Sequence, residues 1–346
     1  MATIIITGGS GFFGGILKKR ILDDGFTCVN VDVESDYESH ERLISIKKNI
    51  VDDDVLDKLC EEYRPLAIMH IAALLTHAVK DQGELFRQNV EGTRKVAMAA
   101  AKHGVKTVVF TSSNALFGGT STDQLITELD EPRPAEEYGR SKLESERILL
   151  SYSDQFNSVI FRCPNIMDAG RLGLLAILFA FIDEGRKVWV VGDGNIRHQC
   201  VYAGDVADAC MKALSYDRSD VFNIGSENVS TFREMFEYVV RKANTGARVR
   251  QFPKRTAILA MRLSYALRIS PLGQYQYRML VEPFEFDISK IRAQLGWHPT
   301  LTNQEILYKS YEYYHGHRDE ILSRKGVSAH RQVAKMGVIR VLKLFS

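Results

Sequence analysis

The sequence predicts an α/β protein whose main unit is a doubly wound parallel sheet, followed by a smaller, mixed α/β region. In the first half of the chain, short β-branched runs alternate with longer segments of helical spacing. This alternation is typical of a parallel sheet that helices cover on both faces. A glycine-rich turn follows the first run directly, and a composition of 45% apolar and 25% charged residues is that of a globular chain.

The strand candidates are short apolar runs, which suits strands that are buried on both faces. In chain order they are Thr3–Thr7, Thr27–Asp32, Ala67–Ile71, Thr107–Thr111 and Ser158–Phe161. The segments between them place apolar residues at helical spacing. These helix candidates are Phe12–Asp24, Asp53–Tyr63, Glu84–His103 and Glu136–Tyr152.

In the second half of the chain the alternation becomes less regular. We predict a helix at Leu172–Glu184, a strand at Lys187–Val191 and a helical piece at Asp287–Leu295. The expected domains are therefore residues 1–164, which hold the sheet, and residues 165–321, a smaller region that is partly interleaved with it.

The C-terminal residues 322–346 form a separate, basic segment with six Lys or Arg and no Asp or Glu. If the last part of this segment forms a helix, that helix is roughly amphipathic. The favoured interpretation is a helix docked on its own domain or on a dimer mate. Contact with a membrane surface is the alternative.

Charge and cysteine content exclude several classes of protein. With 45 basic and 43 acidic residues the net charge is +2, which gives no electrostatic case for binding nucleic acid. The five cysteines form no C-x-x-C pair, so we expect buried thiols and no metal site. The N-terminus lacks signal-peptide features, and the longest uncharged apolar run, Leu172–Ile182, is too short for a bilayer. A cytoplasmic protein is expected.

Directly after the first strand candidate, Gly8–Gly14 (GGSGFFG) fit the pattern G-x-x-G-x-x-G. Such a turn lets a pyrophosphate approach the backbone, and the helix that follows offers free N–H groups to the anion. Asp32 ends the second strand candidate, eighteen residues after Gly14. Its carboxylate accepts hydrogen bonds from an adenosine ribose but repels a 2′-phosphate, so we predict a dinucleotide site that prefers NAD to NADP.

Tyr138 and Lys142 form a Y-x-x-x-K pair on one face of a helix candidate. A phenol has an ordinary pKa of about 10, too high for a base at neutral pH. A neighbouring ammonium and the positive ring of oxidised nicotinamide would lower that pKa. Ser113 follows a strand candidate twenty-five residues upstream, where its hydroxyl can hydrogen-bond an oxygen that alternates between alcohol and ketone.

In this order the motifs resemble those of the extended short-chain dehydrogenases/reductases, in the branch of nucleotide-sugar epimerases and dehydratases, over about residues 2–316. Further stretches that carry the resemblance are HIAA (His70–Ala73), Asn89 in NVEGT, TSSNALFG, RCPN (Arg162–Asn165), GDGNIRHQCVYAGDVADA (Gly192–Ala209) and FDISKIRAQLGWHP. The resemblance implies a Rossmann-type NAD-binding domain in residues 1–164 and a substrate-binding region in residues 165–321. It also implies a homodimer formed through Glu84–His103 and Glu136–Leu150, although these segments could equally be ordinary surface helices of a monomer.

The resemblance also implies a role for individual residues. Tyr138 would be the acid/base, Lys142 its partner and the anchor of the nicotinamide ribose, and Ser113 the donor to the reacting oxygen. The residues implied as NAD contacts are Gly8, Gly11, Phe12, Phe13, Gly14, Asp32, Ile50, Ala72, Ala73, Asn89, Tyr138, Lys142 and Pro164. Ser113, Asn165 and Arg197 would face the substrate, a nucleotide sugar.

The chain departs from the family pattern at several positions. Asn49-Ile50 stands where an Asp and an apolar residue are usual, and Phe117 replaces the usual Tyr after the serines. Asn114-Ala115 replaces the Asp-Glu pair with which dehydratases expel a hydroxyl, so dehydration is disfavoured. Arg171 either reaches a substrate phosphate or has a surface or structural role.

We therefore expect an NAD-dependent epimerase that acts on a nucleotide sugar through a transient ketone. The alternative is an NAD-dependent dehydrogenase or ketoreductase of a sugar or another secondary alcohol, because the same residues serve both reactions. A non-catalytic NAD-binding scaffold is a remote third possibility. The sequence leaves the nucleotide, the sugar and the reacting carbon open.

Overall fold

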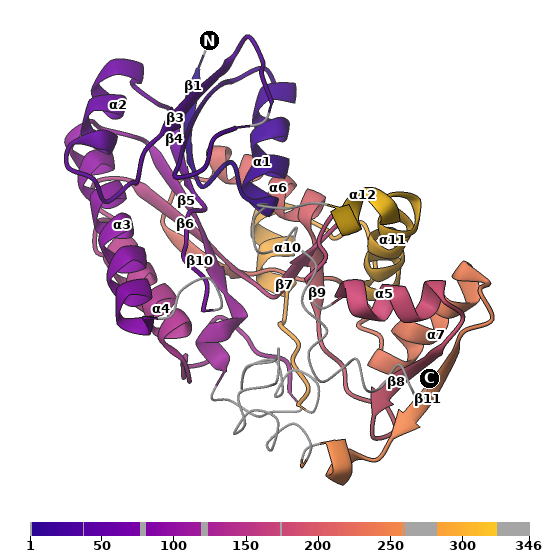
Figure 1. Ribbon diagram of the computed structural model, residues 1–346. Helices are drawn as coiled ribbons and strands as arrows, with labels where there is room; N and C mark the ends of the chain where they lie inside the picture. The colour runs from indigo at the N-terminus through magenta and orange to yellow at the C-terminus, as the bar shows by residue number, and fades with distance from the viewer. Residues whose placement is uncertain are drawn as a thin grey trace.

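A parallel sheet forms the centre of the protein in a computed structural model, which describes residues 2–36, 38–76, 81–118, 124–173, 175–257, 259 and 282–323 (Figure 1). The sheet has seven strands in the order β10-β6-β5-β4-β1-β2-β3, and neighbouring strands run parallel throughout. The strands are β1 (Thr3–Thr7), β2 (Thr27–Asp32), β3 (Leu43–Lys47), β4 (Ala67–His70), β5 (Thr107–Ser113), β6 (Asn157–Cys163) and β10 (Asp220–Asn223).

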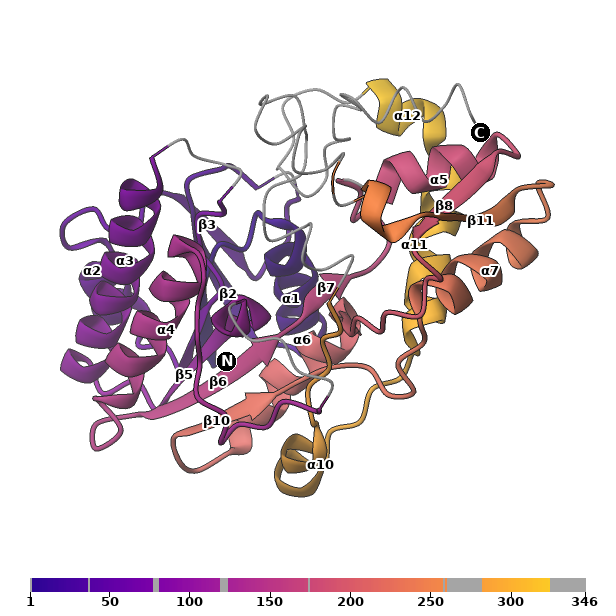
Figure 2. The same cartoon turned by 90° about the horizontal axis from the view of Figure 1, so that it is seen from below.

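Helices cover both faces of this sheet (Figures 1 and 2). One face packs against α2 (Val55–Tyr63), α3 (Gln82–Lys102) and α4 (Glu137–Leu150), and the other against α1 (Phe12–Asp23), α6 (Ala203–Lys212) and α10 (Ser289–Leu295). Each face has its own apolar core. This arrangement confirms the predicted doubly wound, Rossmann-type fold.

The strand order reverses between β1 and β4, which fixes where a ligand can bind. From β1 the chain proceeds through β2 to β3 on one side, and from β4 through β5 to β6 on the other. Thr7 at the end of β1 pairs with His70 at the end of β4. In open α/β sheets, ligands bind beyond the carboxyl ends of the strands at such a switch point.

A second region lies beyond the carboxyl ends of the sheet and has its own apolar core (Figure 1). It contains two small parallel sheets, β8 with β11 and β7 with β9. Its elements are β7 (Asn165–Met167), α5 (Leu175–Asp183), β8 (Lys187–Val191), β9 (Cys200–Tyr202), α7 (Phe232–Ala243), β11 (Arg248–Phe252), α11 (Asn303–Gly316) and α12 (Arg318–Ser323).

The two regions interleave, because the chain returns to the large sheet after it has begun the second region. Strand β10 pairs with β6, and α6 packs on the same face as α1. Trp297 is fully buried there and donates from Nε1 to Asp205 O of α6 at 2.8 Å. The large sheet thus also contains residues that follow residue 164. The division of the chain at residue 164 therefore stays a prediction about which part binds the cofactor and which part binds the substrate. Nearly all of the expected basic tail lies outside the described residues.

No described helix is both long enough and apolar enough to cross a membrane.

Candidate active site

The glycine turn between β1 and α1 is so tight that side chains would not fit. Gly8 has φ +79°, and an added Cβ would lie 2.8 Å from the backbone of Ala72. A Cβ on Gly14 would lie 2.0 Å from the carbonyl oxygen of Gly8, well inside contact distance. The turn, the start of α1 and Ala72 after β4 are thus in close contact, as the sequence predicts for the phosphate end of a dinucleotide site.

The backbone amides at the start of α1 are the groups that an anion would meet. The amide of Gly9 donates to Asn30 Oδ1 at 2.9 Å, so it is used within the protein. The amides of Phe12 and Phe13 have no acceptor among the residues that the structure describes. Free amides at the positive end of a helix stabilise phosphate oxygens. The turn therefore fits the diphosphate of a dinucleotide.

Asp32 lies at the end of β2, beside this turn. Its Oδ2 accepts the amide hydrogen of Ser10 at 2.9 Å, and its Oδ1 accepts that of Glu34 at 3.0 Å. The side chain is half-buried, and each oxygen keeps a second lone pair. The carboxylate can therefore accept the hydroxyls of a ribose, which agrees with the NAD preference predicted from the sequence.

A buried ion pair behind the turn was not predicted from the sequence. Lys18 of α1 pairs with Asp36, which also accepts hydrogen bonds from Asn30 Nδ2 at 2.7 Å and Ser10 Oγ at 3.2 Å. Asn30, which accepts the amide hydrogen of Gly9 in the turn, is thus itself held in place by Asp36. A lysine on the sheet-facing side of an amphipathic helix is the sequence signal that would have indicated such a pair.

Three predicted catalytic residues come together at the carboxyl edge of the sheet. Ser113 ends β5, and Tyr138 lies in the first turn of α4, where Ser113 acts on the pKa of its phenol. The Ser113 hydroxyl donates to Asn114 Oδ1 at 3.4 Å and accepts the amide of Ala115 at 3.1 Å. The Nζ atom of Lys142, one turn later, lies 5.9 Å from the centre of the Tyr138 ring. Lys142 is buried and donates to Thr111 O at 2.8 Å.

Electrostatics at this cluster differ from the expectation in one respect. Burial, and to a smaller extent Cys163, raise the pKa of Tyr138 to about 12, while Arg171 and Ser113 oppose that rise. We had expected Lys142 to lower the pKa of the phenol. Burial instead lowers the pKa of Lys142 itself to about 8, because its ammonium loses hydration when it enters the protein.

Asn89 of α3 connects the loop after β4 to α4. Its Nδ2 donates to Leu74 O and Ser141 Oγ, both at 3.1 Å, and its Oδ1 accepts the amide of Leu74 at 2.7 Å. Both amide hydrogens are thus used within the protein. Through these hydrogen bonds Asn89 holds the loop that carries Ala72 and Ala73 against α4.

The remaining predicted residues come after β6, whose last residue, Cys163, pairs with Ser113 in the sheet. Pro164 joins β6 to β7, and Asn165 begins β7. Arg197 forms an isolated β-bridge with Thr231 in the second region. Hydrogen bonds from Thr231, and to a smaller extent the charge of Arg197, lower the pKa of Glu234. Within the described part of the chain no contact joins Arg197 to the three catalytic candidates.

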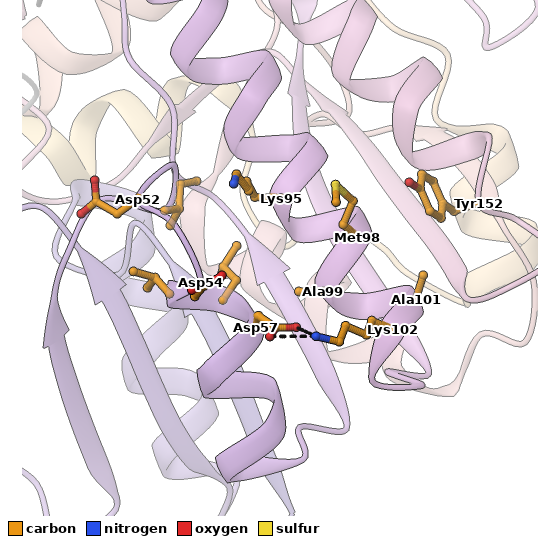
Figure 3. A pocket seen from close by; sticks show the side chains of 12 residues that line it. Asp52, Asp54, Asp57, Lys95, Met98, Ala99, Ala101, Lys102 and Tyr152 are labelled. Atoms are coloured by element: carbon orange, nitrogen blue, oxygen red, sulfur yellow. Dashed lines mark hydrogen bonds and ion pairs between the residues drawn. The ribbon is translucent and has the colours of Figure 1, made fainter.

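Ile50 borders a surface groove of about 390 Å³ between the start of α2 and α3 (Figure 3). The groove is lined by both apolar and charged residues, and Asp57 and Lys102 among them pair at 2.8 Å. Ser113, Tyr138 and Lys142 do not line it. It is therefore a feature separate from the candidate site.

Comparisons with known proteins agree with this geometry. The model of the NAD-dependent epimerase/dehydratase family matches residues 4–225. The chain is 32% identical over 342 residues to a Sinorhizobium fredii protein called uncharacterized protein y4nG, covering 98% of this chain and 85% of that protein. It is 27% identical over 331 residues to the UDP-glucose 4-epimerase of Mycolicibacterium smegmatis, covering 90% and 97%.

The fold also matches a solved structure. The crystal structure of UDP-glucose 4-epimerase from Thermotoga maritima, determined with UDP-glucose, superposes with a TM-score of 0.75 at 22% identity. The match covers 91% of this chain and 99% of that one. The predicted resemblance to extended short-chain dehydrogenases/reductases is confirmed, and so is NAD as the cofactor of the family. The chain belongs to the NAD-dependent epimerase/dehydratase family.

Proposed function

We propose that the protein is an NAD-dependent epimerase that inverts a secondary alcohol of a nucleotide sugar. The observation that carries the proposal is the placement of Ser113 at the end of β5 and of Tyr138 one helical turn before buried Lys142, whose Nζ lies 5.9 Å from the centre of the Tyr138 ring. Ser113 lies at the carboxyl end of β5, one strand away from the switch point between β1 and β4, where the glycine turn fits a dinucleotide. A protein that only bound NAD would have no use for a phenol held in this way.

Each of the three residues has a role in the proposed reaction. Tyr138 takes the proton of the sugar hydroxyl as its oxygen becomes a ketone, and returns it in the second half-reaction. Ser113 donates a hydrogen bond that holds the reacting oxygen beside the phenol. Lys142, with its Nζ 5.9 Å from the centre of the Tyr138 ring, supplies a positive charge on the same helix face as the phenol. NAD, when bound, accepts a hydride from the carbon and gives it back.

Two side chains favour epimerisation over dehydration. Asn114 and Ala115 directly follow Ser113, in the 3₁₀ turn Asn114–Phe117. Loss of water from a sugar needs an acid to protonate the leaving hydroxyl and a base to remove a proton. Neither an amide nor a methyl group exchanges protons at neutral pH, so these positions cannot supply that pair.

A nucleotide sugar is the substrate class that the relatives support. The similar proteins of M. smegmatis and T. maritima are both named UDP-glucose 4-epimerase. We propose that Asn165 and Arg197 contact the diphosphate of such a substrate, because an amide and a guanidinium donate well to phosphate oxygens.

The homodimer is a further proposal. Helices α3 and α4 lie side by side on one face of the sheet (Figure 1), and Met98 of α3 is 52% exposed there. A second copy that packs on these helices would cover this side chain. Light scattering of the purified protein, and of Met98→Glu, tests it: a dimer that the variant weakens supports the proposal, and a monomeric parent contradicts it.

The decisive experiment offers the purified protein a panel of UDP- and dTDP-sugars, with and without added NAD. Products are identified by NMR, and NADH is followed by absorbance. A sugar isomer formed without net NADH supports the epimerase. Stoichiometric NADH with an oxidised sugar would instead establish the dehydrogenase alternative, and a product that has lost water would establish a dehydratase.

A further inference from the structure

A buried ion pair joins helix α4 to the large sheet. The Nη2 atom of Arg162 donates to Glu146 Oε2 at 2.8 Å, and its Nε atom lies 3.1 Å from Oε1 and 3.3 Å from Oε2. The side chains of Arg162 and Glu146 are only 7% and 3% exposed. A guanidinium that meets both oxygens of a carboxylate fixes the angle between the two groups as well as their separation. The pair therefore defines how α4 lies against the sheet.

On the side of the sheet, this pair begins from a strand that has a neighbour on each edge. Arg162 belongs to β6, and in the register of the sheet it stands opposite Ser112 of β5 and Asn223 of β10. A shift of β6 would break backbone hydrogen bonds to both of these strands, which is costly inside a protein. Arg162 is therefore a fixed point to which α4 is attached.

On the side of the helix, the pair begins from the face that carries the candidate base. Tyr138, Lys142 and Glu146 follow one another at intervals of four residues along α4, so they share one face of the helix. Lys142 Nζ donates to Thr111 O at 2.8 Å, one residue before the partner of Arg162 in β5. This face is thus attached to β5 through Lys142 and to β6 through Glu146.

Arg162 also contacts the turn that follows Ser113. Its Cζ lies 5.6 Å from the centre of the Phe117 ring, and Phe117 is the last residue of the 3₁₀ turn that begins directly after Ser113. A guanidinium at this distance from an aromatic ring is attracted to it. One side chain therefore contacts both the helix that carries Tyr138 and the turn next to Ser113.

Stability alone gives no reason for an ion pair at this place. Burying a carboxylate and a guanidinium is expensive, and apolar side chains of similar size often replace such a pair without loss of stability. Among the residues that the structure describes, Arg162 Nη1 has no hydrogen-bond partner, which adds to the cost. What the ion pair offers beyond apolar packing is a contact with a defined direction.

We propose that Glu146 and Arg162 are positioning residues, whose ion pair holds the face of α4 with Tyr138 and Lys142 in place beside the end of β5. The inference rests on the proposed function, in which Tyr138 is the acid/base and Ser113 holds the reacting oxygen. The pair acts through α4 and takes no part in the proton transfer itself. It matters for the rate because a displacement of about 1 Å between reacting groups can cost about 10²-fold in turnover.

The test replaces both ions by apolar side chains of similar length. The double variant Glu146→Met, Arg162→Met keeps the packing and removes the directed contact, so we expect it to unfold at about the same urea concentration as the parent. Crystal structures of the NAD-loaded proteins should show the Tyr138 phenol displaced by about 1 Å relative to Ser113. On the substrate found by the panel, kcat should fall by about 10–100-fold and KM should change less than about twofold.

The matched control is a second ion pair of the same helix. Glu144 and Arg147 pair at 3.5 Å on the exposed side of α4, where their side chains are 38% and 68% exposed. Exposed pairs of this kind contribute little to stability. Glu144→Met, Arg147→Met should therefore match the parent in unfolding, in the position of the phenol and in kcat.

A phenol that stays in place in the double variant would overturn the inference, and so would a displaced phenol with unchanged kcat. If the double variant does not fold, Glu146→Leu, Arg162→Met is measured in the same way, and failure of both to fold would show that the pair serves stability only. The crystal structures need no substrate. A parent that turns over no nucleotide sugar therefore contradicts the proposed function alone, and the position of the phenol still decides the inference.

Discussion

Lys18 and Asp36 form an ion pair directly behind the glycine turn, and their side chains are only 4% and 3% exposed. Removing two charges from water costs several kcal/mol, which their attraction and further hydrogen bonds must offset. Asn30 and Ser10 supply such bonds to Asp36. The glycine turn therefore packs on a buried polar network in which the loss of one group leaves the others without a hydrogen-bond or ion-pair partner.

Asp36→Ala should lower the free energy of unfolding by about 3–5 kcal/mol, because it leaves a buried ammonium without a partner. Urea denaturation measures the change. The double variant Lys18→Met, Asp36→Leu should recover much of the loss, since no charge is then buried. Asp23→Ala is the control: it breaks the exposed Lys19–Asp23 pair and should cost at most about 1 kcal/mol. Equal losses in the two single variants would contradict this account.

Gly14→Ala should abolish NAD binding, because the new methyl group would lie 2.0 Å from Gly8 O and force the turn open. Titration calorimetry with NAD measures this. Gly316→Ala adds the same methyl group at the end of α11, where nothing lies within 4 Å, and should bind NAD as the parent does. Unchanged NAD affinity in Gly14→Ala would place the cofactor elsewhere.

Tyr138→Phe should keep NAD binding and reduce turnover by about 10²–10⁴-fold, the usual range for loss of a general acid–base group. Steady-state kinetics on the substrate found by the panel checks this, together with NAD titration. Tyr152→Phe removes a phenol just beyond the far end of α4 and should turn over normally. Full activity in Tyr138→Phe would exclude it as the base.

Lys142→Met should make the protein more stable at pH 7, by about 1–3 kcal/mol, although it removes a residue of the candidate site. Burial lowers the pKa of Lys142 from 10.5 to about 8, so below pH 8 the folded protein carries a poorly hydrated charge. Between pH 8 and 10.5 the unfolded chain binds this proton and the folded protein does not. Stability of the parent should therefore rise with pH in that window.

Denaturation at pH 7 and pH 10 checks this, because the advantage of Lys142→Met should shrink as the pH rises. Lys95→Met removes a more exposed ammonium from α3 and serves as the control, without such a pH-dependent advantage. A variant that is less stable than the parent at pH 7 would show that the hydrogen bond to Thr111 O outweighs the burial of the charge.

Much of the sheet could be predicted from the sequence because its strands are buried on both faces. The predicted bounds of Thr3–Thr7 and Thr27–Asp32 coincide with β1 and β2. The predicted bounds of Lys187–Val191 coincide with β8 of the small sheet, in which buried and more exposed residues alternate. Strand β3 was missed because it lies at the sheet edge and is only partly buried, so its residues lack a continuous apolar run. Strand β10 was missed because four residues acquire strand structure only by pairing with the distant β6.

The placement of site residues could be predicted where a short motif fixes the local backbone geometry. It could not be predicted where the contact joins segments that are far apart in the sequence. The glycine pattern and the Y-x-x-x-K spacing each lie within one turn or helix, so the sequence predicted how their residues are placed. The contact of Arg171 with Phe12 joins residues 159 positions apart and depends on a turn held by α11. Likewise, the effect of burial on Lys142 depends on the packing of α4 against β5, which no spacing encodes.

The place of β10 in the sheet governs how the protein can be assembled and divided. Until the chain has been made as far as Asn223, one side of β6 has no partner, and an unpaired strand edge invites association with other chains. A fragment that stops at residue 164 would keep that edge open and would also lack α6, which covers part of the apolar face beside α1. We therefore expect that residues 1–164 do not fold stably without the residues that follow them.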